Sequence, residues 1–235
     1  MARGSTGSGP RSGRVARSES PALRAILSQK SPAVRLVGNL VKSKALTEKN
    51  GRFVEGGDLP PTDELVKMAN KELAEAERAM ARASVEHSAI YDEDDNQIMV
   101  KTSHDSSAVY LSPKEMKAMK GKVFTHNHPI VDGVSLPFSR ADVTLLHFTK
   151  AREFRAVAGE TVFSISPPKD SKFWKMKESE VDKLLNVART TAFLNLGYTE
   201  DTINRATTAD LGRALDDMLK MVDRKLNIGY TKKTL

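Results

Sequence analysis

The sequence predicts a mixed α/β domain with a helical C-terminal extension and a disordered basic arm at its N-terminus. Strand-length apolar stretches bounded by turn residues alternate with helical segments between residues 62 and 166. Helical patterns fill the chain after residue 178, and the excess of positive charge is confined to the first 50 residues. With 235 residues, of which 39% are hydrophobic, the chain is long enough for one sizeable domain or two small ones.

The basic arm is defined by its charge. Residues 1–50 contain ten Lys and Arg but only two acidic residues, so the net charge of +7 belongs to this segment and the rest is nearly neutral. Residues 1–20 are rich in Gly, Ser and Arg, which predicts disorder, whereas residues 21–44 alternate apolar and basic residues and could form short amphipathic helices. Such an arm is typical of binding to nucleic acid or to an acidic protein surface, and a solubilising tail explains the same charges.

The first predicted helix follows a turn-rich linker at residues 50–61. Thr62 is the expected N-cap, and the next two residues place acidic side chains in the first turn. Apolar residues at helical spacing continue to about residue 82, namely Leu65, Met68, Ala69, Leu73, Ala76 and Met80. A single helix over about 63–82 is therefore predicted.

Strands dominate the next segment. Strands at about 84–91 and 97–102 form a hairpin around an acidic turn, which lacks the glycine and the terminal glutamate of a calcium loop. A short strand at 108–111 and a helix that opens with Ser112 and Pro113 follow. We then expect a strand that carries His126, a loop over 130–138, a helix over 139–150, and a second hairpin from strands at 154–158 and 161–166.

The C-terminal residues are predicted to be helical, with helices at about 179–195, 199–207 and 209–226. The first of these carries too many apolar residues for one narrow stripe. It is therefore either packed deeply or part of an interface.

The composition excludes several classes of site. The chain has no cysteine, so disulfides and thiolate zinc sites are excluded, and any metal must be held by histidine and carboxylate. It contains no apolar run of membrane-spanning length, and residues 1–10 lack the apolar segment of a signal peptide. We therefore expect no association with a membrane.

The candidate site begins with Thr125-His126-Asn127-His128-Pro129. Residues 121–125 have the pattern of a short buried strand, and side chains at positions i and i+2 of a strand point the same way. His126 and His128 should then share one face with Phe124, while the alternate residues point to the other face. Two imidazoles placed in this way can bind one cation.

A hydrolytic metal site needs about three protein ligands and an open position for water. Asp142 is the candidate third ligand, because it falls in the first turn of the helix expected to start at Ser139. Glu86 is the candidate general base, since a carboxylate in a sheet-forming stretch is unusual. Ser139 could donate a hydrogen bond to a developing oxyanion. The Ser139-x-x-Asp142 pair also fits a capping box, which gives both residues a structural explanation.

Taken together, His126-Asn127-His128-Pro129, Ser139-x-x-Asp142 and the upstream Glu86 resemble the signature of the JAB/JAMM metalloprotease superfamily. The Asn between the histidines is similar to the RadC-type branch, and to the HNHP domains of Mu F-like phage head-morphogenesis proteins and bacterial polymorphic toxins. The resemblance covers residues 84–168. It implies a three-layer, deaminase-like α/β sandwich.

The resemblance also implies roles for the site residues. His126, His128 and Asp142 would bind Zn²⁺, Glu86 would activate the metal-bound water, and Ser139 would help to stabilise the tetrahedral intermediate. The family reaction is hydrolysis of a peptide or isopeptide bond in a protein substrate. The loop at 130–138 is longer than the usual length of about six residues, but added loop length costs little free energy.

A second hypothesis is a non-enzymatic phage virion or head component that uses the same fold as a scaffold. Its partners would be virion proteins, and nucleic acid bound through residues 1–50. An HNH nuclease is discounted, because in those enzymes the three residues are dispersed through a ββα-metal unit. We divide the chain into a basic arm and linker (1–60), a JAB/JAMM-like metal-binding domain with its leading helix (61–168) and a helical extension (169–235). The expected location is the cytoplasm or a virion, and the oligomeric state stays open.

Overall fold

The computed structural model describes residues 47–49, 52–54, 63–102 and 109–235, and side chains from Leu65 onward. The predicted arm lies outside these residues, apart from Thr47–Lys49 (β1) and Arg52–Val54 (β2). These two strands lie within residues 1–60, which the sequence predicts to be a mostly disordered arm and linker. Strands of three residues are too short to show an alternating pattern in the sequence.

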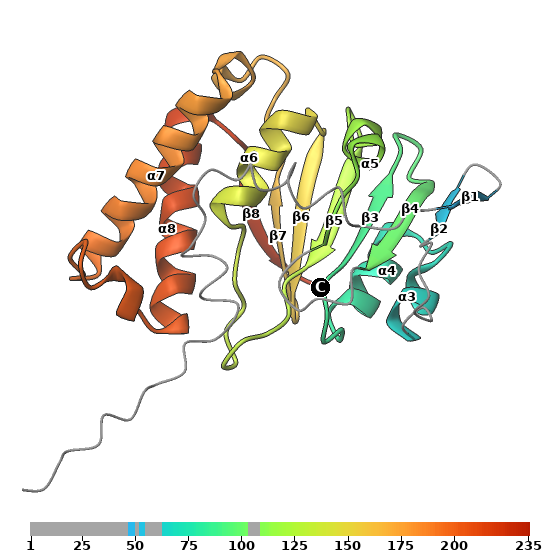
Figure 1. The fold of residues 1–235 in the computed structure, drawn as a ribbon, viewed down its shortest axis with the longest axis horizontal. Helices are drawn as coiled ribbons and strands as arrows, with labels where there is room; N and C mark the ends of the chain where they lie inside the picture. The colour runs from blue at the N-terminus through green and yellow to red at the C-terminus, as the bar shows by residue number, and fades with distance from the viewer. Residues whose placement is uncertain (1–46, 50–51, 55–62, 103–108) are drawn as a thin grey trace, which may run out of the picture.

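The strands form one mixed sheet in the order β1-β2-β4-β3-β5-β6-β7-β8 (Figure 1). Its body consists of β4 (Gln97–Thr102), β3 (His87–Tyr91), β5 (Val123–Asn127), β6 (Glu153–Ala158), β7 (Thr161–Ile165) and β8 (Tyr230–Thr234). Within this body β5 and β6 are parallel, and the other neighbours are antiparallel. The predicted mixed α/β class is confirmed.

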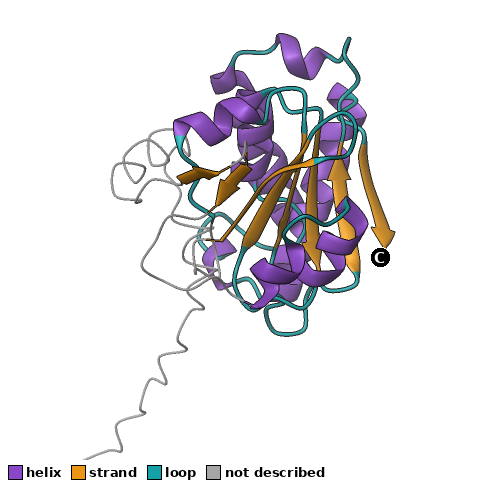
Figure 2. Ribbon diagram, turned by 90° about the vertical axis from the view of Figure 1, so that its right-hand side faces the viewer, coloured by secondary structure: helices purple, strands orange, loops and turns teal. Residues whose placement is uncertain are grey.

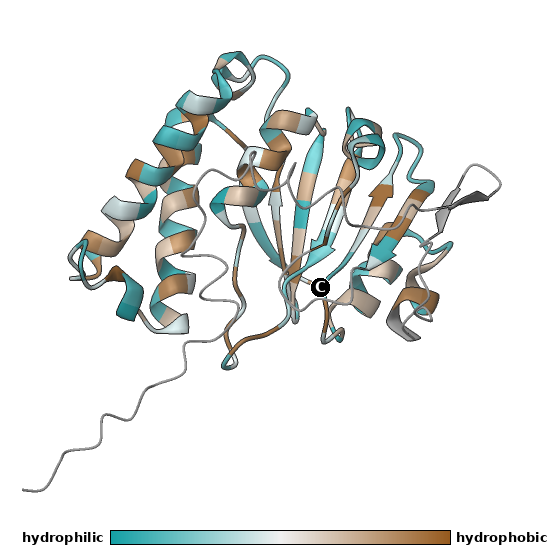
Figure 3. Cartoon of the chain, viewed as in Figure 1, coloured by the Kyte–Doolittle hydropathy of each residue, from teal (hydrophilic) through white to brown (hydrophobic). Residues whose placement is uncertain are grey.

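Helices cover both faces of the sheet (Figure 2). The helices of one face are α3 (Asp63–Met68) and α4 (Leu73–Met80). Those of the other face are α5 (Pro113–Ala118), α6 (Arg140–Thr149), α7 (Glu178–Asn195) and α8 (Thr208–Leu226). Apolar and polar residues alternate along α7 and α8, as expected for helices with one buried face (Figure 3). None of the described helices is both long and apolar enough to cross a membrane.

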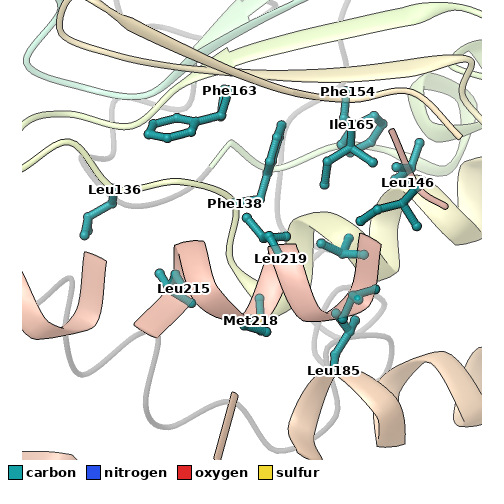
Figure 4. Packing of buried hydrophobic residues seen from close by; sticks show 14 of the residues in the cluster. Leu136, Phe138, Leu146, Phe154, Phe163, Ile165, Leu185, Leu215, Met218 and Leu219 are labelled. Carbon is teal, nitrogen blue, oxygen red and sulfur yellow. The ribbon is translucent and has the colours of Figure 1, made fainter. Parts of the chain in front are cut away.

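The larger core lies between the sheet and α6, α7 and α8. Phe154, Phe163 and Ile165 project from β6 and β7 toward Met218 and Leu219 of α8 (Figure 4). All five side chains are almost completely buried, and burial of such side chains contributes about 1.5–3 kcal/mol each. Val143 and Leu146 of α6 belong to the same cluster, so the core also packs α6, which begins beside the candidate site, against the sheet.

The opposite face of the sheet is held by a buried ion pair. Arg155 on β6 donates from Nη2 to Oε2 of Glu77 on α4 at 2.8 Å, and the carboxylate of Glu77 also accepts a bond from Thr125 Oγ1 at 3.1 Å. Arg155 further donates to Glu153 Oε1 at 2.9 Å. Because Thr125 precedes His126, this network fixes β5 from the face that the two histidines do not use.

The prediction of a single helix over about 63–82 is wrong, because the helical conformation is interrupted between α3 and α4. Asn70 has a left-handed backbone conformation (φ 60°), which Asn tolerates better than most residues. Its N–H donates to Gln97 Oε1 at 2.7 Å, and Gln97 Nε2 donates to the carbonyl of Met68 at 2.9 Å. A side chain from β4 thus supplies the bonds that a continuous helix would have made.

Other element boundaries also differ from the prediction. The strand that carries Glu86 was expected from residue 84 but begins at His87, and residues 109–111 form no strand. Residues 199–207 contain only the short 3₁₀ turn Ile203–Arg205 in place of a helix.

The predicted helical extension also contains β8, which pairs with β7 and was missed. Its helices α7 and α8 share the larger core with the strands, so residues 169–235 pack as part of the same unit as the sheet.

Candidate metal centre

His126 lies on β5 and His128 directly follows its last residue, and the two rings face the same point, as the strand pattern predicts. Phe124 packs in the larger core and its ring stacks on that of His126, with 5.3 Å between the ring centroids. Val123 belongs to the core on the opposite face, and Thr125 bonds to Glu77 there. The ring nitrogens of His126 and His128 converge, with their Nε2 atoms 3.0 Å apart.

Asp142 reaches the same point from the first turn of α6. Its Oδ1 lies 3.4 Å from His126 Nε2, and its Oδ2 lies 3.7 Å from His128 Nε2. In the described part of the chain, these three residues form a group whose ligand atoms all lie within 4.8 Å of one another. The structure therefore brings together the three residues that the sequence proposed as metal ligands, and the group could hold a metal ion.

The spacing of these atoms fits a tetrahedral ion. Zinc–nitrogen bonds of about 2.0–2.1 Å place neighbouring tetrahedral ligands about 3.3 Å apart, near the 3.0 and 3.4 Å distances from His126 Nε2. The orientation of His128 also fits, because its Nδ1 lies 3.0 Å from the carbonyl oxygen of Leu136. A donor at Nδ1 leaves Nε2 with a free lone pair that points at the centre.

The electrostatics of the centre favour the forms that bind a cation. Burial, followed by the electrostatic effect of the neighbouring His126, lowers the pKa of His128, which favours its neutral form. Burial alone would raise the pKa of Asp142. The hydrogen bond and electrostatic effect of His126, followed by the electrostatic effect of His128 and the hydrogen bond of Ser139, outweigh burial and hold that pKa well below its usual range. Both shifts favour the protonation states that bind a metal, which are the neutral form of the imidazole and the charged form of the carboxyl group.

Ser139 is the N-cap of α6 and forms a capping box with Asp142. Its backbone N–H and its hydroxyl both donate to Asp142 Oδ2 at 2.7 Å, and its Oγ accepts from the N–H of Asp142 at 3.3 Å. The structural explanation of this motif is therefore confirmed. It does not compete with metal binding, because the capping bonds use Oδ2 while Oδ1 is the closer oxygen to His126.

Glu86 immediately precedes β3 and is 9% exposed. Strand β3 pairs with β5 as far as Ser88, which lies opposite His126, so Glu86 is two residues beyond the last paired position. Glu86 is not a member of the three-residue ligand group.

Asn127 holds the chain on both sides of Glu86, and sequence reasoning gave this side chain no function. Its Oδ1 accepts from the N–H of His87 at 2.7 Å, and its Nδ2 donates to the carbonyl of Val85 at 3.1 Å. The amide replaces the backbone ladder where β3 leaves β5. An amide side chain can donate and accept hydrogen bonds at once, and this was the only feature of the sequence that could have predicted the role of Asn127.

The long loop between the histidines and Ser139 is fixed at several points. Thr208 of α8 donates to Asp132 Oδ2 at 2.6 Å, and Ser135 Oγ donates to the carbonyl of Ala158 at 2.9 Å. A β-bridge joins Val131 to Val134 within the loop. The added loop length is thus built into contacts with α8 and β6, and it delivers Ser139 and Asp142 to the two histidines.

Comparison with known proteins yields no match: no family model, curated protein or solved structure matches this chain.

Proposed function

We propose that this protein is a zinc-dependent hydrolase that cleaves a peptide or isopeptide bond in a protein substrate. The observation that carries the proposal is the convergence of His126, His128 and Asp142, from β5 and the start of α6, on one point. Two imidazoles and one carboxylate leave one position of a tetrahedral zinc ion open, which is the arrangement of catalytic rather than structural zinc sites.

The chemistry divides between the metal and the chain. Zinc, when bound, acts as a Lewis acid that polarises a carbonyl and lowers the pKa of water. Glu86 takes the proton of the attacking water and returns it to the leaving amine. Ser139 holds Asp142 in position, and its hydroxyl stabilises the developing oxyanion by exchanging its bond to Asp142 for one to the substrate oxygen.

The order of the elements supports a JAB/JAMM-type sandwich. A strand preceded by Glu86 leads through a hairpin and α5 to β5, which carries His126 and is followed directly by His128. Helix α6 then starts with the Ser-Asp pair, and the hairpin of β6 and β7 follows. This order is the one that the resemblance implies for residues 84–168.

The proposal is tested with the purified full-length chain and a panel of peptides and isopeptide-linked peptides. We expect cleavage of at least one member when zinc is present, loss of cleavage after treatment with a chelator, and recovery when zinc is restored. Cleavage that a chelator does not affect would contradict a metal-dependent mechanism.

A virion or head component is the second candidate, and the basic residues of the 1–50 segment favour it. In that case the fold would serve as a scaffold and the arm would bind nucleic acid. Zinc binding without cleavage of any peptide in the panel would favour this candidate over the hydrolase.

A further inference from the structure

Two buried polar atoms beside the metal centre have no hydrogen-bond partner in the described part of the chain. They are Nδ1 of His126 and Oγ of Ser88. Ser88 is completely buried on β3, and His126 is 4% exposed on β5. An unpaired buried polar group costs about 1–3 kcal/mol, so two such groups at one place call for an explanation.

The two atoms belong to neighbouring side chains. Ser88 and His126 are directly paired in the antiparallel register of β3 and β5, so their side chains leave the same face of the sheet. The β-carbons of such a pair lie about 4.5–5.5 Å apart. Oγ and Nδ1 are also the polar atoms nearest to the backbone in their side chains, so both lie close to the sheet. The ring of His126 is otherwise flanked by Phe124 and Phe138, which offer no hydrogen-bond acceptor.

The proton on the His126 ring has to change place when a metal binds. The Nε2 atoms of His126 and His128 are 3.0 Å apart, which is a hydrogen-bond distance, and His128 Nε2 is the acceptor because its Nδ1 faces a carbonyl. Without a metal, His126 therefore carries its proton on Nε2 and its Nδ1 is an acceptor. As a metal ligand, Nε2 must be bare, and the neutral ring carries the same number of protons with the proton on Nδ1.

We propose that Ser88 is the positioning residue that orients His126 for the metal and partners its Nδ1 when the metal is bound. In the described part of the structure both atoms are unpaired. When Nε2 binds the metal and the ring proton lies on Nδ1, the Ser88 hydroxyl is the neighbouring group that can accept a hydrogen bond from the Nδ1–H. This inference rests on the proposed zinc site, since histidine ligands of metals almost always donate their second N–H to such a partner.

The test compares zinc dissociation constants, measured by competition with a chromophoric chelator. We expect Ser88→Ala to weaken zinc binding by about tenfold or more, which is the usual loss for such a partner, and Ser88→Thr to restore most of it. Ser164→Ala is the matched control and should bind zinc as the wild type does, because Ser164 lies on β7 and bonds to Thr231 at 2.7 Å. Thermal unfolding of each variant shows whether the fold is retained.

Nitrogen NMR of the His126 ring gives a second measurement. It compares only the wild type and Ser88→Ala, so it does not depend on whether Ser88→Thr folds. On zinc binding, the wild-type Nδ1 signal should move from the acceptor range to the N–H range, with a hydrogen-bonded proton that Ser88→Ala shifts upfield. Equal zinc affinity and equal Nδ1 proton shifts in the wild type and Ser88→Ala would overturn the role of Ser88 and leave the zinc site intact. A wild-type protein that binds no zinc would overturn the proposed function and this inference together.

Discussion

Replacing both His126 and His128 by alanine is expected to abolish stoichiometric zinc binding and leave the fold intact. The variant loses two of three ligands and keeps only Asp142, which is already engaged by Ser139. Structural zinc in zinc-finger peptides, which has four protein ligands, binds with about 10–16 kcal/mol, so the loss of two of three ligands should weaken binding by at least about a thousandfold. Chelator competition and metal analysis of the purified variant measure this loss.

A matched control is available on the neighbouring helix. His147 of α6 is buried against Phe173, with 5.0 Å between the ring centroids, and it is not a member of the ligand group. His147→Ala should therefore bind one zinc with wild-type affinity, whatever its effect on stability. Wild-type zinc affinity in the double variant would show that the two imidazoles do not hold the metal.

The second large effect is expected at Glu86. Glu86→Gln keeps the size and most of the hydrogen-bonding capacity of the side chain, but an amide cannot take a proton from water. We expect kcat to fall by about a hundredfold or more, as is typical for loss of a general base, with the zinc affinity unchanged because Glu86 is not a ligand. Steady-state kinetics on a peptide that the wild type cleaves, with zinc content measured on the same samples, make this comparison.

Glu153→Gln is the control for that experiment. Glu153 lies on β6 and bonds to Arg155, whose other partner is Glu77 on the opposite face of the sheet from the histidines. Its loss should leave kcat near the wild-type value. Full activity of zinc-loaded Glu86→Gln would remove Glu86 as the base and direct the search to another proton acceptor.

The ligand group could be predicted from the sequence because local rules determine most of it. Alternation along β5 and into the residue after it places His126 and His128 on one face, and a helix capped by Ser139 places Asp142 in its first turn. The capping box and the metal ligand were competing explanations for Asp142 in the sequence. In the structure one carboxylate does both, because it has two oxygens.

The features that the sequence did not reveal depend on contacts between distant residues. The break before α4 comes from Gln97, which follows Asn70 by 27 positions and caps the end of α3. The clamp of Asn127 on the chain around Glu86 spans 40 positions or more. Strand β8 escaped detection because it is an exposed edge strand with two lysines, and such strands lack an apolar alternation.

The most direct test is zinc-edge X-ray absorption on the protein loaded with one equivalent of zinc. Two imidazole nitrogens at about 2.0–2.1 Å and oxygen ligands at about 2.0–2.2 Å are predicted, with imidazole scattering that disappears in the variant without His126 and His128. A spectrum without imidazole scattering, or a wild-type chain that retains no zinc, would contradict the claim that β5 and α6 together form a metal centre.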